Sequence, residues 1–135
     1  MIRMSETVQT QHSSGYTPLI LIVEDNELNR DTLRDILEFE NYRVSIAQNG
    51  QEAIWKTNEE MPNLILMDIQ MPIMNGLEAT QFIRENPRTA EIPIIVLTGL
   101  AMQWDRERCL AMGANAYLTK PISYQTLIEK ISSFL

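Results

Sequence analysis

Short apolar runs alternate with stretches of helical periodicity along most of the chain, which is typical of a repeated strand–helix unit. The expected strands span residues 19 to 23, 43 to 47, 64 to 67, 93 to 97 and 116 to 119. The runs LILIV, LILM and PIIVL are apolar at consecutive positions, as expected of central parallel strands that helices cover on both faces. The pattern therefore predicts an α/β domain with five βα units.

The segment from 27 to about 40 gives the first helical pattern. Four apolar residues fall near one side of such a helix, with Phe39 as a further candidate; the four are Leu28, Leu33, Ile36 and Leu37. We expect that side to be buried.

Capping residues support the expected helix boundaries. Asn49 precedes Glu52 by three residues, and Asn75 precedes Glu78 by the same spacing. In each pair the asparagine can accept from a free backbone amide while the acid reaches back, so a helix should begin there. Gly113 suits the left-handed end of the fourth helix, and Ser123 suits the cap of the fifth.

Composition and charge exclude several classes of protein. A chain of 135 residues can form one domain without disulfides, and its single cysteine has no partner within the chain. No apolar run approaches the roughly 20 residues that cross a bilayer, and the polar start lacks the core of a secretion signal. The net charge of -7 opposes binding to nucleic acid or anionic membrane. We therefore expect a cytoplasmic protein with no nucleic-acid or membrane partner.

The first residues differ in composition from the rest. Residues 1–17 are rich in Ser, Thr and Gln and have scarcely any apolar periodicity. We expect a disordered tail there, followed by one domain over residues 18–135. His12, the only histidine, lies in this tail without an evident partner and receives no role.

Chemically active side chains follow four of the expected strands. The acidic pair Glu24 and Asp25 follows the first, Asp68 the third, Thr98 the fourth and Lys120 the fifth. Because the carboxyl ends of parallel strands lie along one edge of a sheet, these residues should converge into one pocket.

Three carboxylates, a hydroxyl and an ammonium suit magnesium-dependent phosphoryl transfer. Mg²⁺ prefers hard oxygen ligands, and like charges about 4 Å apart cost on the order of 4 kcal/mol at an effective dielectric near 20, so the acidic cluster favours a cation. An aspartate can attack phosphorus directly when positive charge neutralises the phosphoryl oxygens. Asp68 is the candidate phosphate acceptor.

Four segments together resemble the successive motifs of the receiver domain of bacterial two-component response regulators. They are LILIVEDNELNR, LILMDIQMPIMNGLEA, IPIIVLTGLA and GANAYLTKPIS, and the resemblance covers about residues 18–135. It implies a flavodoxin-like, doubly wound three-layer sandwich with a five-stranded parallel sheet in the order 2-1-3-4-5. It also implies a signalling switch rather than an enzyme with an external substrate.

The resemblance assigns the metal site and the phosphoacceptor. Asp68 would accept a phosphoryl group from a kinase phosphohistidine. Asp25, Asp68 and the backbone carbonyl of Gln70 would bind Mg²⁺, while Glu24 would act mostly through a metal-bound water. Glu24 stands where receivers often carry aspartate, which preserves the charge and lengthens the reach.

The resemblance also assigns the switch. Thr98 and Lys120 would bind the phosphoryl oxygens, and the Lys120–Pro121 bond would be cis. Thr98 would move toward the phosphate, and Tyr117 would turn into the vacated space. The surface formed by the fourth helix, fifth strand and fifth helix would change as a result.

Two further positions, Gln70 and Leu100, flank the path of the hydrolytic water in receivers. The apolar Leu100 cannot orient that water, so we predict that it shields the acyl phosphate and lengthens its life. Leu100→Ala should therefore dephosphorylate faster than the parent protein in a decay assay. An unchanged rate would contradict this role.

The expected partners are a sensor histidine kinase or histidine phosphotransfer protein, and a downstream effector. The docking face would surround the first helix, at Glu27, Asn29, Arg30 and Arg34. DNA-binding regulators that dimerise through the fourth helix, fifth strand and fifth helix usually carry an acid before the switch aromatic and a basic last helix. Here Ala116 precedes Tyr117, so we expect a monomer or weak dimer.

Several alternatives remain open. The chain is interpreted as a stand-alone regulator, but a receiver excised from a hybrid histidine kinase would look the same. A phospho-independent interaction module would usually have lost part of the acidic pocket. An aspartate-nucleophile phosphatase would be expected to carry an acid where Gln70 stands. Trp55 and Trp104 are interpreted as packing residues rather than binding hot spots.

Overall fold

The predicted five-stranded parallel sheet is confirmed in the computed structural model, which describes residues 17–69, 75–99 and 103–135. Its strands are β1 (Leu19–Val23), β2 (Arg43–Ala47), β3 (Leu64–Asp68), β4 (Ile94–Thr98) and β5 (Ala116–Thr119). All neighbours pair in parallel, in the order β2-β1-β3-β4-β5. Chain order reverses between β1 and β3, and this is where the carboxyl edge of an open α/β sheet forms its crevice.

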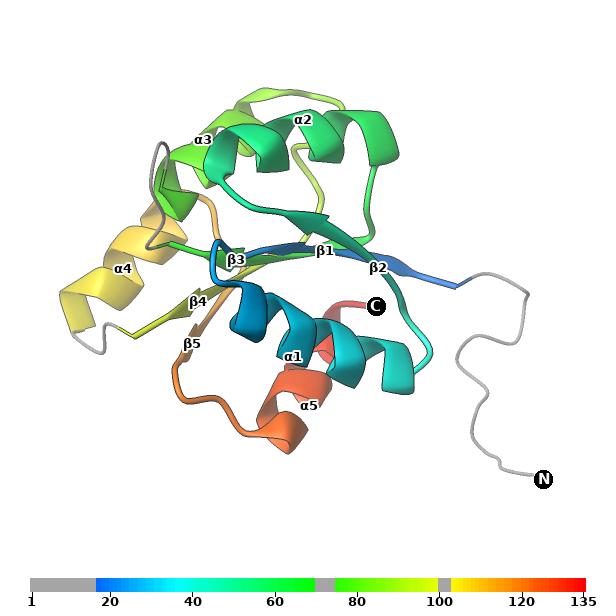
Figure 1. Cartoon of the computed structure of the whole chain (residues 1–135). Coiled ribbons are helices and arrows are strands. Elements are labelled where there is room, and N and C mark those ends of the chain that lie inside the picture. Colours follow the sequence, from blue (N-terminus) through cyan, green and yellow to red (C-terminus); the bar gives the residue numbers. More distant parts are fainter. Residues whose placement is uncertain (1–16, 70–74, 100–102) are drawn as a thin grey trace.

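Helices cover both faces of the sheet and complete the three layers (Figure 1). They are α1 (Glu27–Phe39), α2 (Gly50–Glu60), α3 (Gly76–Glu85), α4 (Gln103–Ala111) and α5 (Tyr124–Phe134). Apolar residues of α1 and α5 pack in one cluster, and those of α2, α3 and α4 pack in the other. None of the helices in the described ranges is long and apolar enough to cross a bilayer.

The central strands are buried because both their faces are covered. Every residue of β3 and β4 is buried, which explains the unbroken apolar runs that precede Asp68 and Thr98. Leu66 contributes to the α1–α5 side of the core, and its neighbour Met67 contributes to the opposite side. Each such side chain contributes roughly 1.5 to 3 kcal/mol when fully buried. The strand ends that carry the polar residues are therefore held by a close-packed core.

The capping residues act as expected, with one difference. Asn75 and Glu78 form a reciprocal capping box at α3, and Ser123 caps α5. Asn49 accepts from the amide of Glu52, but the Glu52 carboxylate accepts from the amide of Gln48, one residue earlier than the pattern predicts. Gly113 ends the fourth helix region with a φ of 116°, which favours glycine.

Two apolar residues of α1 are not buried as expected. Leu28 is 74% exposed and Phe39 is 77% exposed. At 3.6 residues per turn these two project together, roughly a third of a turn away from Leu33, Ile36 and Leu37, which pack on the sheet. The prediction thus assigned too many residues to the buried side of α1, since Leu28 and Phe39 do not belong to it.

The interpretation of Trp55 as a packing residue is wrong, since its side chain is 61% exposed on α2. The tail expected over residues 1–17 falls almost wholly outside the described residues, and so does the side chain of Trp104.

Candidate functional site at the carboxyl edge of the sheet

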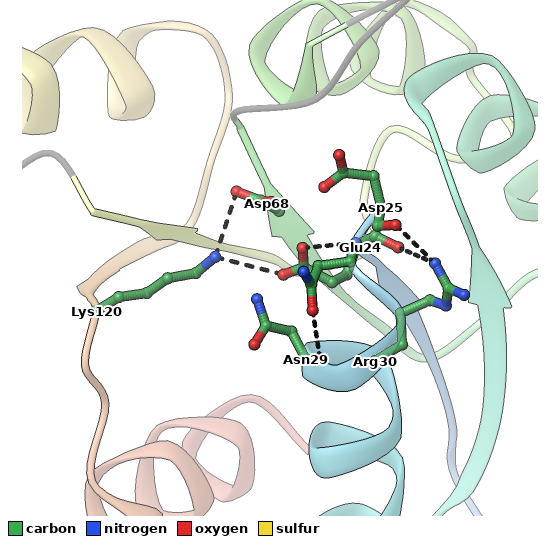
Figure 2. A network of polar contacts seen from close by, with 7 residues as sticks. Glu24, Asp25, Asn29, Arg30, Asp68 and Lys120 are labelled. Carbon is green, nitrogen blue, oxygen red and sulfur yellow. Dashed lines mark hydrogen bonds and ion pairs between the residues drawn. The ribbon is translucent and has the colours of Figure 1, made fainter.

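The strand ends bring Glu24, Asp68 and Lys120 together from three parts of the sequence. The Nζ atom of Lys120 lies 3.3 Å from Glu24 Oε1 and 3.6 Å from Asp68 Oδ1. Figure 2 shows the ammonium facing the two carboxylates from the end of β5. Glu24 and Asp68 are only 2% and 4% exposed, so these ion pairs lie largely out of water. The convergence expected from the strand ends is therefore present.

Asp25 completes an acidic cluster with Glu24 and Asp68. One carboxylate oxygen of each residue lies within 4.8 Å of the others. Asp25 is exposed, whereas the other two are buried, so the cluster opens to solvent on one side. Three hard oxygen donors at this spacing, one of them accessible, are the type of ligand set that Mg²⁺ takes from proteins. The residues present thus fit a magnesium ion.

The charge balance of the cluster also favours a bound cation. Burial, and next the negative charge of Asp68, raise the pKa of the Glu24 carboxyl. The charge of Lys120 and the amide of Asn26 oppose this shift but do not cancel it. The Lys120 ammonium therefore does not fully offset the burial of Glu24 beside Asp68, and further positive charge would be stabilising.

Hydrogen bonds fix the loop between β1 and α1 that carries the acidic pair. Arg30 Nη1 donates to the carbonyl oxygens of Glu24 and Asp25, at 3.2 and 2.9 Å (Figure 2). The amide of Asn26 donates to Glu24 Oε2 at 3.2 Å, and its side chain caps α1 by accepting from the amide of Asn29 at 2.9 Å. Arg30 was expected only on a docking face. Its guanidinium also holds the backbone of the two acids, a role that no local sequence signal reveals.

Gly76 is a second residue that the sequence reasoning missed. A Cβ atom at this first position of α3 would lie 2.3 Å from the carbonyl oxygen of Asp68 and 2.8 Å from the Cα of Ile69. The Gly76 amide donates to the carbonyl of Ile69 at 3.3 Å. The start of α3 therefore presses on the backbone of the strand end that carries Asp68. Asn75 marks the start of α3 in the sequence but does not indicate this close approach.

Thr98 and Tyr117 lie on the adjacent strands β4 and β5, and their side chains are on the same face of the sheet. Thr98 is fully buried at the end of β4 and pairs with Thr119 of β5, two residues beyond Tyr117. Because alternate residues share a face, Tyr117 and Thr98 both point toward the side that α2, α3 and α4 cover. Tyr117 is half-buried against the core of that side.

The turn after β5 aims Lys120 at the acids. The Lys120 amide donates to the carbonyl of Thr98 at 2.7 Å, and the Lys120–Pro121 bond is cis, as expected. Gln70 and Leu100 lie outside the described residues, so their roles stay predictions.

The raised pKa of Glu24 predicts a pH dependence of stability for the metal-free protein. The folded state holds the Glu24 proton more tightly than the unfolded chain, whose pKa is near 4.5. The associated stability is present below that pKa and is lost as the pH rises through the raised folded value. Urea unfolding with a chelator should show this loss as the pH rises above about 4.5, and Glu24→Gln should reduce it. An identical pH slope in Glu24→Gln would contradict the assignment.

The chain matches a known protein family. The family model for the response regulator receiver domain matches residues 20–132. The polar-differentiation response regulator DivK of Brucella anthropi is 44% identical over 116 residues, which cover 86% of this chain and 94% of the relative. DivK of Brucella abortus is 43% identical over 119 residues, covering 88% and 97%.

Solved structures agree with the sequence matches. The receiver domain of sensor histidine kinase PA1611 from Pseudomonas aeruginosa, which has a magnesium ion coordinated in its active site cleft, aligns with a TM-score of 0.82 and 35% identity, covering 88% of this chain and 98% of that one. Chemotaxis protein CheY4 of Vibrio cholerae aligns with a TM-score of 0.84 and 28% identity, covering 89% and 100%. With the fold, the acidic cluster and the family match in agreement, the chain belongs to the response regulator receiver domain family of two-component signalling.

Proposed function

We propose that the protein is a phosphorylation-dependent switch in which Asp68 accepts a phosphoryl group from the phosphohistidine of a histidine kinase or phosphotransfer protein. One observation carries the proposal: the buried Asp68 carboxylate lies 3.6 Å from the Lys120 ammonium and within an acidic cluster that fits Mg²⁺. A nucleophilic carboxylate, a fixed cation and a metal-binding set are together what phosphoryl transfer to aspartate requires.

Glu24, Asp25 and Asp68 would hold the metal, with the backbone carbonyl of Gln70 as a further proposed ligand. A bound Mg²⁺ would supply positive charge to the phosphoryl oxygens. The exposure of Asp25 supports entry of the ion from solvent, and the bonds from Arg30 to the loop backbone keep the acidic pair oriented.

Asp68, Lys120 and Thr98 have different roles in the proposed phosphoryl transfer. An Asp68 oxygen attacks phosphorus, the bond from phosphorus to the donor nitrogen breaks, and an acyl phosphate forms on Asp68. Lys120 stabilises the negative charge that builds on the phosphoryl oxygens, and it is already positioned for this before the reaction. Thr98 would donate its hydroxyl to the same group.

The switch would run through Thr98 and Tyr117. Their shared sheet face supports the proposal, since movement of Thr98 toward the phosphate would free space on the side to which Tyr117 belongs. Tyr117 is half-buried, so an inward turn would remove further ring surface from water. The packing of α4, β5 and α5 would then shift, and an effector protein would bind one of the two arrangements more tightly.

Intact mass spectrometry after incubation with Mg²⁺ and acetyl phosphate tests the proposal. One phosphoryl adduct is expected on the parent protein, and none on Asp68→Asn or in the presence of a chelator. If no adduct appears, the beryllium fluoride mimic distinguishes rapid hydrolysis from inability to bind a phosphoryl group. Failure to bind the mimic as well would favour a phospho-independent interaction module.

A further inference from the structure

Two exposed aromatic side chains frame a groove between α2 and α3. Trp55 of α2 is 61% exposed and Phe82 of α3 is 53% exposed. The two helices lie side by side on the same face of the sheet (Figure 1). The hollow between the aromatic residues has a volume of about 650 Å³. Its other lining residues are Gln51, Ile54, Asn58 and Asn86.

Helical spacing gives the α2 wall of this α2–α3 groove a continuous stripe. Gln51, Ile54, Trp55 and Asn58 recur at intervals of three and four along α2. Trp55 also borders a second hollow of about 440 Å³, so its side chain lines two depressions. Exposed aromatic residues beside pockets are the type of side chain that protein interfaces bury at their centre.

Glutamates flank both aromatic residues at helical-neighbour positions. Glu52 and Glu59 lie three residues before and four after Trp55. Phe82 has the matching pair, Glu78 four residues before it and Glu85 three after. The apolar groove is thus bordered by carboxylates on both of its helices.

The basic residues of α2 and α3 do not neutralise this border. Lys56 directs its ammonium to the carbonyl oxygen of Ile46. Arg84 donates to the carbonyls of Gly113 and Ala90 and to the side chain of Asn115. Arg88, beyond α3, is the basic residue at the groove edge, where it donates to Asn58 Oδ1 at 2.7 Å. The α2–α3 groove is therefore apolar at its centre and predominantly acidic around it.

We propose that the α2–α3 groove binds a basic amphipathic helix of a partner protein. Apolar side chains of that helix would enter between Trp55 and Phe82, and its Lys or Arg residues would meet the flanking glutamates and the face of Trp55. Charge complementarity selects this occupant. A second copy of the chain in two-fold pairing would bring two acidic faces together, and an anionic lipid surface would be repelled. The groove and the acidic cluster around Asp68 have no residue in common, and the proposed binding uses the groove residues alone.

Amide chemical-shift mapping of the ¹⁵N-labelled full chain tests the proposal. The probe is a synthetic amphipathic helical peptide with leucine on one face and lysine on the other, compared with a peptide in which glutamate replaces lysine. The lysine peptide should shift α2 and α3 amides and the Trp55 indole, and its affinity should fall as salt rises. Trp55→Ala and Phe82→Ala should each weaken binding by about ten-fold or more.

Matched controls separate this groove from general attraction to an acidic protein. Phe39→Ala removes a highly exposed aromatic residue from α1 and should leave the affinity unchanged. Equal binding of the glutamate peptide, shifts centred on α1 and α5, or full affinity in both groove variants would each overturn the proposal. Shifts of the groove amides that depend on protein concentration without peptide would show that a second copy occupies it instead.

Discussion

Lys120→Ala is expected to slow the phosphorylation of Asp68 by about 100-fold, the scale of losing one preorganised charge from a transition state. The Lys120 ammonium lies within 3.6 Å of the Asp68 carboxylate before any phosphoryl group arrives, so its charge needs no rearrangement to act. The measurement is the initial rate of adduct formation with acetyl phosphate at saturating Mg²⁺.

Magnesium affinity distinguishes this electrostatic role from a merely structural one. Removing a positive charge 3.3 Å from Glu24 leaves the acidic cluster more negative, so Lys120→Ala should bind Mg²⁺ at least as tightly as the parent while it reacts more slowly. Lys130→Ala, which removes a lysine of α5 away from the cluster, is the matched control and should react at the parent rate. A Lys120→Ala rate within two-fold of the parent would contradict the role given to this side chain.

Gly76→Ala is expected to destabilise the protein by about 3 kcal/mol, the upper part of the range for overpacking. The added methyl group would lie 2.3 Å from a backbone oxygen of Asp68, which cannot rotate away as a side chain would. Relief requires α3 and the end of β3 to separate, and this also displaces the residue proposed to react.

Urea denaturation of Gly76→Ala, followed by phosphorylation at a temperature where the variant remains folded, checks both consequences. Gln81→Ala changes an exposed position of the same helix and should alter stability by less than about 0.5 kcal/mol. A Gly76→Ala protein as stable as Gln81→Ala would show that α3 does not press on the strand end as the structure indicates.

The strands and their carboxyl edge were predictable from sequence because a strand that is buried on both faces has apolar residues at consecutive positions. The consecutive apolar residues of β3 and β4 indicate strands that are covered on both faces, and parallel pairing places Asp68 and Lys120 at the same edge of the sheet. That the two residues meet there also depends on the strand order, which the family resemblance implied. The helix cap formed by Asn75 and Glu78 was equally predictable, since these two residues interact within one helical turn.

Features that depend on packing between distant elements were not predictable in this way. Leu28 and Phe39 are apolar, but which stripe of α1 meets the sheet depends on the angle at which the helix docks. Arg30 acts through backbone carbonyls of the preceding loop, and the need for glycine at Gly76 arises only once α3 lies against β3. Trp55 was misread for the same reason, because neighbouring helices decide whether an aromatic residue is covered.

The most direct test of the proposed switch is to locate the phosphoryl group on the chain. Borohydride reduces an aspartyl phosphate to homoserine, so treatment of the phosphorylated protein followed by peptide mapping identifies the modified residue. The proposal predicts homoserine at position 68 alone, in amounts that depend on Mg²⁺. Conversion at Asp25 or another acid with Asp68 intact, or a stable adduct that resists borohydride, would contradict the assignment of Asp68 as the phosphoacceptor.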